Sequence, residues 1–356
     1  MWLRKSVWAA AAFGACVIIA VALPVQHDVL SDKVRLVGRF ETGPRGITAE
    51  WPGSLIEIHF KGARLDVKLF DSGDNDLVVE VNGKASRLRT RPGPHSYRLV
   101  NADAPSTYVV RLIRRTEATF GRTVLLDVRT DGQMLPPPPD RPRILVIGDS
   151  ISAGYGLEAG AAANCHDGNM QNQYLTYAAV AARNLDADVI TLAVSGAGLV
   201  RNYDGNTRQT MERVVHRQLP SSSVKAPLPS AQVVVVHLGT NDFLGGARPE
   251  EFTKAYKALL EAVRATSPEA MIYAAVGPML KADDWDVAAA SIEKAVSGRR
   301  GIGDSGISLI RFERTTDPED TVCDGHPAIG AHARMARELE QKILADTGWR
   351  RMDWQN

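Results

Sequence analysis

The sequence has almost no net charge and no block of basic residues. Among its 356 residues, 42 lysines and arginines offset 41 aspartates and glutamates, which leaves a formal net charge of +1. Proteins that bind nucleic acid usually present a basic patch to the phosphate backbone, so the sequence indicates no nucleic-acid partner. Internal repeats are also absent, and low-complexity sequence is limited to the N-terminus and one run of prolines.

Long apolar runs are absent except at the N-terminus. Arg4 and Lys5 precede an uncharged run over residues 7–23, and small residues at 20 and 22 fit a cleavage site. Residues 1–22 are therefore predicted to be a secretory signal peptide. The alternative is a membrane anchor that stays uncleaved, because about 17 apolar residues are enough to span a bilayer. In both cases the rest of the chain is predicted to be exported, so that it is periplasmic or secreted. It is expected to contact a membrane only through the N-terminal segment, and only if that segment stays uncleaved.

Cysteine is scarce. The chain has three, and cleavage of the leader would leave only Cys165 and Cys323. Both lie in polar segments rather than in apolar runs. In an oxidising compartment they are predicted to form a disulfide, and two buried free thiols are the alternative.

Residues 31–134 contain short apolar runs that alternate with polar residues and are broken by turn residues. Ile56, Ile58 and Phe60 form one such run, and Asn82-Gly83 is a strong hairpin turn. A period of two places one face of each strand in a core. Regular spacing of such runs without helical periods is typical of a β-sandwich, which we predict for this domain.

Four consecutive prolines at 136–139 interrupt this pattern and predict a stiff linker over residues 135–142. Over residues 143–350, apolar runs then alternate with segments of helical period. This alternation predicts an α/β fold, in which a three-layer α/β/α domain surrounds a parallel sheet. The runs expected to form its strands are 144–147, 189–193, 233–238, 272–276 and 307–310.

The first of these runs ends in Gly148-Asp149-Ser150. Open α/β folds place their sites at the carboxyl ends of parallel strands, so Ser150 is the candidate nucleophile. A serine hydroxyl is weak unless a base takes its proton and fixed donors hold the oxyanion that forms. A turn with a helix N-cap is the alternative interpretation of this tripeptide.

Three segments further along the chain supply the other groups. Gly196 follows the second run and can turn a backbone N–H toward a substrate, and Asn241 follows the third run with an amide donor. His326, just before a helical segment near the C-terminus, is the candidate base. Each residue has a structural alternative, namely a flexible turn for Gly196, an Asx turn or helix cap for Asn241, and a surface or core histidine for His326.

Together these segments resemble the SGNH (GDSL-type) hydrolases. The matching blocks are Gly148-Asp149-Ser150, Gly196, residues 239–242 and residues 324–327, in the order of that family. The resemblance implies that Ser150 is the nucleophile and His326 the base. It also implies an oxyanion hole formed by the Ser150 N–H, the Gly196 N–H and the Asn241 side chain. Such a mechanism requires no metal site and no organic cofactor.

One branch of this family, carbohydrate esterase family 2, is the closest resemblance. Its members join an N-terminal jelly-roll domain to an SGNH domain and remove O-acetyl groups from plant cell-wall sugars such as xylan and mannan. This chain has the same domain order, and Tyr203-Asp204-Gly205, Gly277-Pro278-Met279 and residues 323–327 are similar to runs of that branch. The short linker favours a jelly-roll domain that walls one side of the active site rather than an independent sugar binder.

The chain departs from the family pattern at the base and before the oxyanion glycine. The triad aspartate usually lies three residues before the histidine, where this chain has Cys323, and Asp324 lies only two before. Either Asp324 reaches the imidazole by a different loop path, or a backbone carbonyl such as that of Cys323 holds the ring. The carbonyl is favoured, because the branch includes members with a Ser-His dyad.

The second departure concerns sugar binding. A tryptophan is common just before the oxyanion glycine of the branch, and this chain has Val194-Ser195 instead. Trp285, in an acidic segment, is an alternative platform for substrate. Its other interpretation is a residue at the start of a helix that packs on the core.

The sequence therefore predicts an exported serine esterase that acts on an O-acetylated poly- or oligosaccharide. A lipid esterase or thioesterase on the same fold is one alternative, because fold does not determine substrate. A glycan-binding protein with an inactive hydrolase domain is the other. The complete set of nucleophile, base and donors counts against it.

Overall fold

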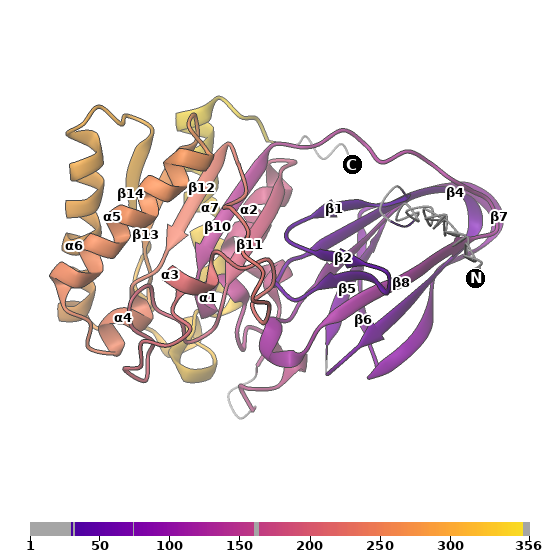
Figure 1. The fold of residues 1–356 in the computed structure, drawn as a ribbon, viewed down its shortest axis with the longest axis horizontal. Helices are drawn as coiled ribbons and strands as arrows, with labels where there is room; N and C mark the ends of the chain where they lie inside the picture. Colours follow the sequence, from indigo (N-terminus) through magenta and orange to yellow (C-terminus); the bar gives the residue numbers. More distant parts are fainter. Residues whose placement is uncertain (1–29, 31–32, 74, 160–163, 352–356) are drawn as a thin grey trace, which may run out of the picture.

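The computed structural model describes residues 30, 33–73, 75–159 and 164–351. An antiparallel β domain and an α/β domain lie side by side (Figure 1). The predicted leader, residues 1–22, lies outside the described residues. Within the described ranges, no helix combines the length and the apolar character that a membrane crossing requires.

The N-terminal domain is built on an antiparallel sheet. Its strand order is β2-β3-β8-β4-β7-β5-β6, and β1 and β9 both pair with β4. Ile56, Ile58 and Phe60, which alternate along β4, lie in the core of this domain as expected from their period. The strands are β1 (Arg35–Val37), β2 (Glu41–Gly43), β3 (Gly46–Ala49), β4 (Leu55–Asp71), β5 (Asp76–Val81), β6 (Lys84–Arg89), β7 (Gly93–Arg114), β8 (Thr123–Thr130) and β9 (Gln133–Met134).

The sequence predicts one detail of this sheet wrongly, namely the length of β4, and another correctly, namely the hairpin between β5 and β6. The alternating runs at 56–60 and 65–69 suggest two short strands, whereas both belong to β4. A register shift between Gly62 and Arg64 allows the strand to bend and continue. The predicted hairpin is confirmed. Asn82 and Gly83 connect β5 to β6 with φ angles of +49° and +82°, the positive values that a two-residue turn of this kind needs.

The C-terminal domain contains a parallel sheet with the order β11-β10-β12-β13-β14. Each apolar run predicted as a strand matches one of these five to within one residue at either end. The fold class predicted from the sequence is therefore confirmed. The strands are β10 (Arg143–Gly148), β11 (Asp188–Ala193), β12 (Val233–His237), β13 (Met271–Val276) and β14 (Ile307–Arg311).

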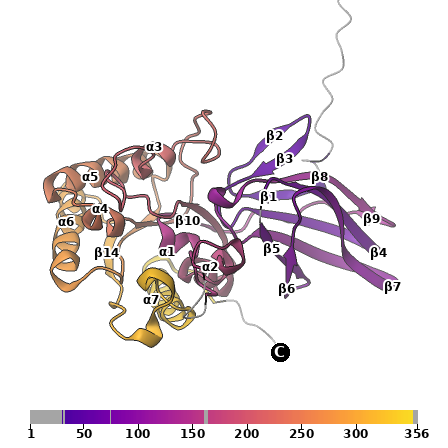
Figure 2. The ribbon, with the colours of Figure 1, turned by 90° about the horizontal axis from the view of Figure 1, so that it is seen from below.

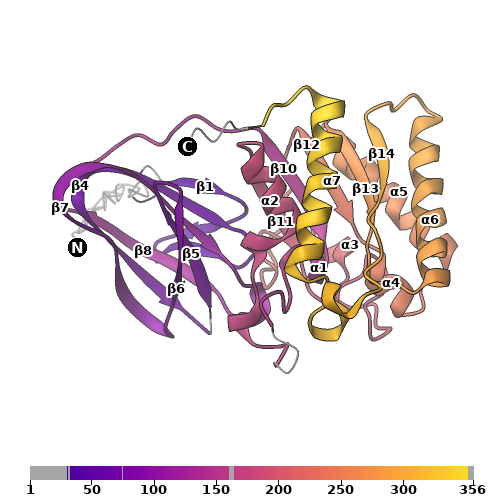
Figure 3. The same ribbon diagram turned by 180° about the vertical axis from the view of Figure 1, so that it is seen from behind.

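Helices cover both faces of the parallel sheet (Figures 2 and 3). One face packs against α2 and α7, and the other against α3, α5 and α6, so two apolar cores lie on opposite sides of the strands. The helices are α1 (Ser150–Ala153), α2 (Tyr177–Asn184), α3 (Met211–Val214), α4 (Thr240–Leu244), α5 (Pro249–Thr266), α6 (Ala282–Arg300) and α7 (Ile329–Thr347).

The strand order reverses at β10. The chain leaves β10 to form β11 on one side of it and then returns to form β12 on the other side. A crevice forms outside the carboxyl end of a strand where the order reverses, and open α/β sheets bind ligands there. Ser150 follows the end of β10 directly after Asp149 and therefore lies at this point of the sheet.

Polar contacts hold the two domains together. Arg35 of β1 forms a buried ion pair with Asp188 of β11. The indole Nε1 of Trp51 donates to the carbonyl of Gln218 at 3.0 Å. Residues 135–142 connect β9 to β10 along the molecule (Figure 1). The domains are thus packed against each other as well as joined by the linker.

Candidate active site

Ser150 is the first residue of the short helix α1. The Asp149 side chain caps this helix by accepting the Ile151 N–H at 3.0 Å. The turn into the helix is tight, because a Cβ at position 148 would lie 2.6 Å from the Cβ of Ser152, a space that only glycine leaves free. The strand and its cap therefore hold Ser150 at a fixed place on the edge of the sheet.

His326 lies within hydrogen-bond distance of Ser150. Its Nε2 is 2.7 Å from the Ser150 Oγ, and its Nδ1 is 3.0 Å from the carbonyl oxygen of Cys323. A carbonyl only accepts, so Nδ1 carries the proton and Nε2 is left to accept from the serine hydroxyl. Burial lowers the pKa of His326, because desolvation disfavours the imidazolium. The lowered pKa favours the neutral ring, and the two contacts orient it with Nε2 toward the Ser150 hydroxyl.

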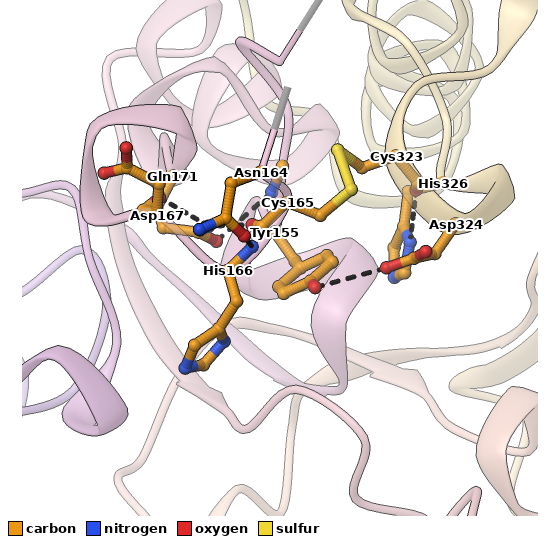
Figure 4. Close-up of a disulfide and its surroundings, with 10 residues drawn as sticks. Tyr155, Asn164, Cys165, His166, Asp167, Gln171, Cys323, Asp324 and His326 are labelled. Atoms are coloured by element: carbon orange, nitrogen blue, oxygen red, sulfur yellow. Dashed lines mark hydrogen bonds between the residues drawn. A yellow bond between two sulfur atoms is a disulfide. The ribbon is translucent and has the colours of Figure 1, made fainter. Parts of the chain in front are cut away.

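Among the described residues, the hydrogen bonds of the His326 ring go to Ser150 and Cys323, and none joins it to Asp324. Asp324 has a φ of +53°, and its carboxylate accepts a hydrogen bond from the Tyr155 hydroxyl at 3.2 Å (Figure 4). The Tyr155 ring packs on the His326 ring with 4.8 Å between centroids. Of the two arrangements left open by the sequence, the structure has the backbone carbonyl on Nδ1. The carboxylate instead holds the tyrosine that covers one side of the imidazole.

A disulfide joins Cys165 to Cys323 (Figure 4). It links the loop that follows α1 to η6 (Cys323–Gly325), the short 3-10 helix just before His326. A Cβ at position 156 would lie 2.9 Å from the Cys323 Cβ, so the two segments also approach each other closely at Gly156. The residue whose carbonyl accepts from His326 is therefore covalently tied to the segment that follows Ser150.

Gly196 and Asn241 follow β11 and β12, the two strands that flank β10. Gly196 has a φ of +75°, and its carbonyl accepts the Tyr203 N–H at 3.1 Å. Asn241 is buried in the first turn of α4, and its Nδ2 donates to the carbonyl of Ala197 at 3.2 Å. An amide nitrogen carries two N–H groups, so one donor of Asn241 remains for another acceptor. The sequence-predicted donors therefore lie on both sides of the strand that carries Ser150.

Asp242 has a role that motif reading missed. Its buried carboxylate accepts the N–H groups of Leu199 and Val200 at 2.8 Å and of Arg201 at 3.1 Å. Burial raises the pKa of Asp242 to about 6. The three hydrogen bonds lower this pKa because they stabilise the charged form, but burial has the larger effect. Asp242 thus fixes the loop that begins at Gly196. Asp242 belongs to the block Gly239-Thr240-Asn241-Asp242 that the sequence analysis singled out, but only Asn241 was given a role there.

Trp285 occupies the first turn of α6. It is partly buried and packs against the core on the side of the sheet that α5 and α6 cover. Its Nε1 is buried and has no hydrogen-bond partner among the described residues. This position matches the helix-start interpretation rather than an open platform for sugar.

Comparisons with known proteins agree with this arrangement. Residues 146–327 match the model of the GDSL-like lipase/acylhydrolase family, and residues 36–139 match that of the carbohydrate esterase 2 N-terminal domain. A solved family two carbohydrate esterase from Clostridium thermocellum, in complex with cellohexaose, is similar with a TM-score of 0.84 and 31% identity, over 89% of this chain and 100% of that one. The chain belongs to carbohydrate esterase family 2 of the GDSL-like hydrolases.

Two curated proteins are also similar to this family 2 member in sequence. Cellulase/esterase CelE of Acetivibrio thermocellus is 32% identical over 319 residues, which are 88% of this chain and 39% of that protein. An acetylxylan esterase / glucomannan deacetylase of Cellvibrio japonicus is 31% identical over 224 residues, 61% of each chain. The chain thus spans less than two thirds of the length of both relatives.

Proposed function

We propose that this chain is a serine esterase that removes O-acetyl groups from carbohydrate. The observation that carries the proposal is the contact of 2.7 Å between Ser150 Oγ and a neutral, oriented His326 at the carboxyl edge of the sheet. The family and the names of the two relatives support a carbohydrate substrate. The predicted leader supports an exported enzyme, periplasmic or secreted.

The proposed reaction follows from the donors and the base. Ser150 Oγ attacks the acetyl carbonyl as its proton passes to His326 Nε2, and the N–H groups of Ser150 and Gly196 with the Asn241 amide stabilise the oxyanion. The imidazolium then protonates the departing sugar oxygen. Water, deprotonated by the same nitrogen, releases acetate from the acyl-serine.

Acetate release from a panel of esters tests this proposal. Acetylated xylan, acetylated mannan, acetylated peptidoglycan and an aryl acetate are compared with long-chain aryl esters and acyl thioesters, with Ser150→Ala as the blank. We expect release from acetylated polysaccharide and from the aryl acetate. Preference for long acyl chains or thioesters would instead show a lipid esterase or thioesterase. Sugar binding without any turnover would show a glycan-binding protein.

Asp324→Asn should keep kcat/KM within about tenfold of the parent, whereas loss of a true triad carboxylate costs roughly 10⁴. The reason is that the Cys323 carbonyl holds Nδ1, and an asparagine still accepts from the Tyr155 hydroxyl. The measurement is kcat/KM on an aryl acetate at a pH where His326 is neutral. Tyr155→Phe is the matched variant, because it removes the same bond and keeps the ring on His326. A loss near 10⁴ for Asp324→Asn would show that the carboxylate orients the base.

Reduction of the Cys165–Cys323 disulfide should lower activity before the chain unfolds. The bond closes a separation of 158 residues, and opening it frees the segment that carries the acceptor for His326. Cross-links over such loops stabilise folded proteins by on the order of 5 kcal/mol, so global stability should fall as well. Hydrolysis of an aryl acetate and near-UV circular dichroism are followed together as reductant is added. Two free thiols in the native exported protein by mass spectrometry would refute the bond.

A further inference from the structure

We propose that Glu117, a residue of the β domain, is a positioning residue for the oxyanion turn of the α/β domain. The oxyanion turn is defined here as residues 194–203, which include Gly196. This inference rests on the proposed function and adds a specific contribution of the N-terminal domain to it.

The contact crosses the boundary between the domains. Glu117 follows β7 and precedes η2 (Ala118–Phe120), and its side chain is 3% exposed. Its Oε2 accepts the N–H of Ser195 at 2.8 Å. Ser195 is the residue just before Gly196, so its backbone sets the direction of the Gly196 N–H. A carboxylate from one domain thus holds the peptide next to a proposed oxyanion donor in the other.

Glu117 is itself held from within the β domain. The guanidinium of Arg114, which is 1% exposed, donates to the Glu117 carbonyl at 3.1 Å and to the Thr123 hydroxyl at 2.7 Å. The same Glu117 carbonyl accepts the Phe120 N–H at 3.1 Å. A side chain positions another group well when its own backbone is fixed, and these bonds fix it.

The other bonds described for the oxyanion turn come from the α/β domain. Asp242 accepts from residues 199–201, Asn241 donates to Ala197, and the Gly196 carbonyl is bonded within the turn. These contacts fix the turn from Gly196 onward. Before Gly196, the Val194 carbonyl accepts the Ala197 N–H at 3.2 Å, and Glu117 adds a side-chain acceptor for the Ser195 N–H, so the donor N–H lies between two anchored segments.

The acceptor oxygen, rather than the negative charge, is the property that this role requires. A negative charge near a developing oxyanion opposes it, and burial already raises the pKa of Glu117. Glutamine keeps an acceptor of the same length and removes the charge. Methionine has a similar length and removes the oxygen acceptor. These two substitutions therefore separate the two properties.

Glu50 provides a matched control within the same chain. It lies in the β domain, is 2% exposed, and accepts from the backbone N–H and the hydroxyl of Ser221 at 3.0 and 2.7 Å. Glu50→Met therefore removes a cross-domain carboxylate contact of the same kind. The described hydrogen-bond and ion-pair partners of Glu50 are Ser221 and Arg122, and neither belongs to the oxyanion turn.

The experiment compares Glu117→Met, Glu117→Asp, Glu117→Gln and Glu50→Met in the full chain. The readouts are kcat and KM on an aryl acetate, the rate at which a fluorophosphonate probe labels Ser150, and the Tm. Loss of a whole oxyanion donor costs about 10²–10³, so we expect a misdirected one to cost about 10–50-fold in kcat and in labelling, with KM within about twofold. Glu117→Asp, which retracts the acceptor, should fall between the parent and Glu117→Met. It also serves as the test if the methionine variant does not fold.

Glu117→Gln should keep kcat within about threefold of the parent. Glu50→Met should keep kcat within about twofold of the parent, even if it lowers the Tm as much as Glu117→Met does. Parental kcat in folded Glu117→Met or Glu117→Asp would overturn the inference. Equal losses in Glu117→Met and Glu50→Met, or in Glu117→Met and Glu117→Gln, would also overturn it. A parent chain that neither hydrolyses esters nor reacts with the probe would instead remove the proposed function itself.

Discussion

Replacement of Ser150 by alanine should abolish hydrolysis of an aryl acetate, with kcat lowered by at least about 10⁴-fold. The Ser150 hydroxyl is the atom that the proposed reaction acylates, and no other oxygen replaces it on His326. Its hydrogen bond is the 2.7 Å contact with His326, so its removal should change the free energy of unfolding by only about 1 kcal/mol.

Ser152→Ala is the matched control for this substitution. Ser152 is a second buried serine of the same helix, and its Oγ lies 3.1 Å from the Tyr177 hydroxyl. We expect this variant to lose stability and to keep turnover. Circular dichroism and thermal melting check that both variants fold, and probe labelling checks that only Ser150→Ala fails to react. Substantial turnover by pure Ser150→Ala would disprove the assignment of the nucleophile.

Asn241→Ala should lower kcat by about 10²–10³, which is the cost of losing one side-chain donor to an oxyanion. The Asn241 amide is buried and faces the oxyanion turn through its bond to Ala197, so one of its N–H groups is already directed and the other is free to act. Because the donor acts on charge that develops in the transition state, KM should change little.

The measurement is kcat and KM on an aryl acetate, with Asn241→Asp as the companion variant. Aspartate keeps the shape of asparagine, removes both donors and places a charge beside the oxyanion. It should therefore lose at least as much kcat as alanine does. A change in KM alone would show that Asn241 binds substrate or caps α4 instead.

The strands and the residues at their carboxyl ends could be predicted from the sequence. An apolar run that ends in a glycine and a polar residue has a local signature, and a parallel sheet brings such ends to one edge. Ser150, Gly196 and Asn241 were found in this way. His326 follows no strand directly, and only its resemblance to a family block and its place before a helix pointed to it.

The contacts that orient these residues could not be predicted in the same way. Glu117 reaches Ser195 across 78 residues and a domain boundary, and no local pattern marks such a pair. The direction of the Asp324 side chain depends on a backbone with positive φ, which sequence spacing does not encode. Asp242 was visible in its block, but its three partners are backbone groups that every residue carries.

The acceptor on His326 has a consequence for how this site would look in a mutational survey. Because it is the main-chain oxygen of Cys323, no exchange of side chain at that position deletes it. Under the proposed mechanism, a library of all single substitutions would therefore reveal an intolerant serine and histidine but no carboxylate that orients the histidine, although a third residue takes part. Replacing the peptide link after Cys323 by an ester keeps this carbonyl but weakens it as an acceptor, and it also removes the Asp324 N–H. A thioamide at Cys323, which weakens the acceptor without altering any side chain, would make the third participant visible.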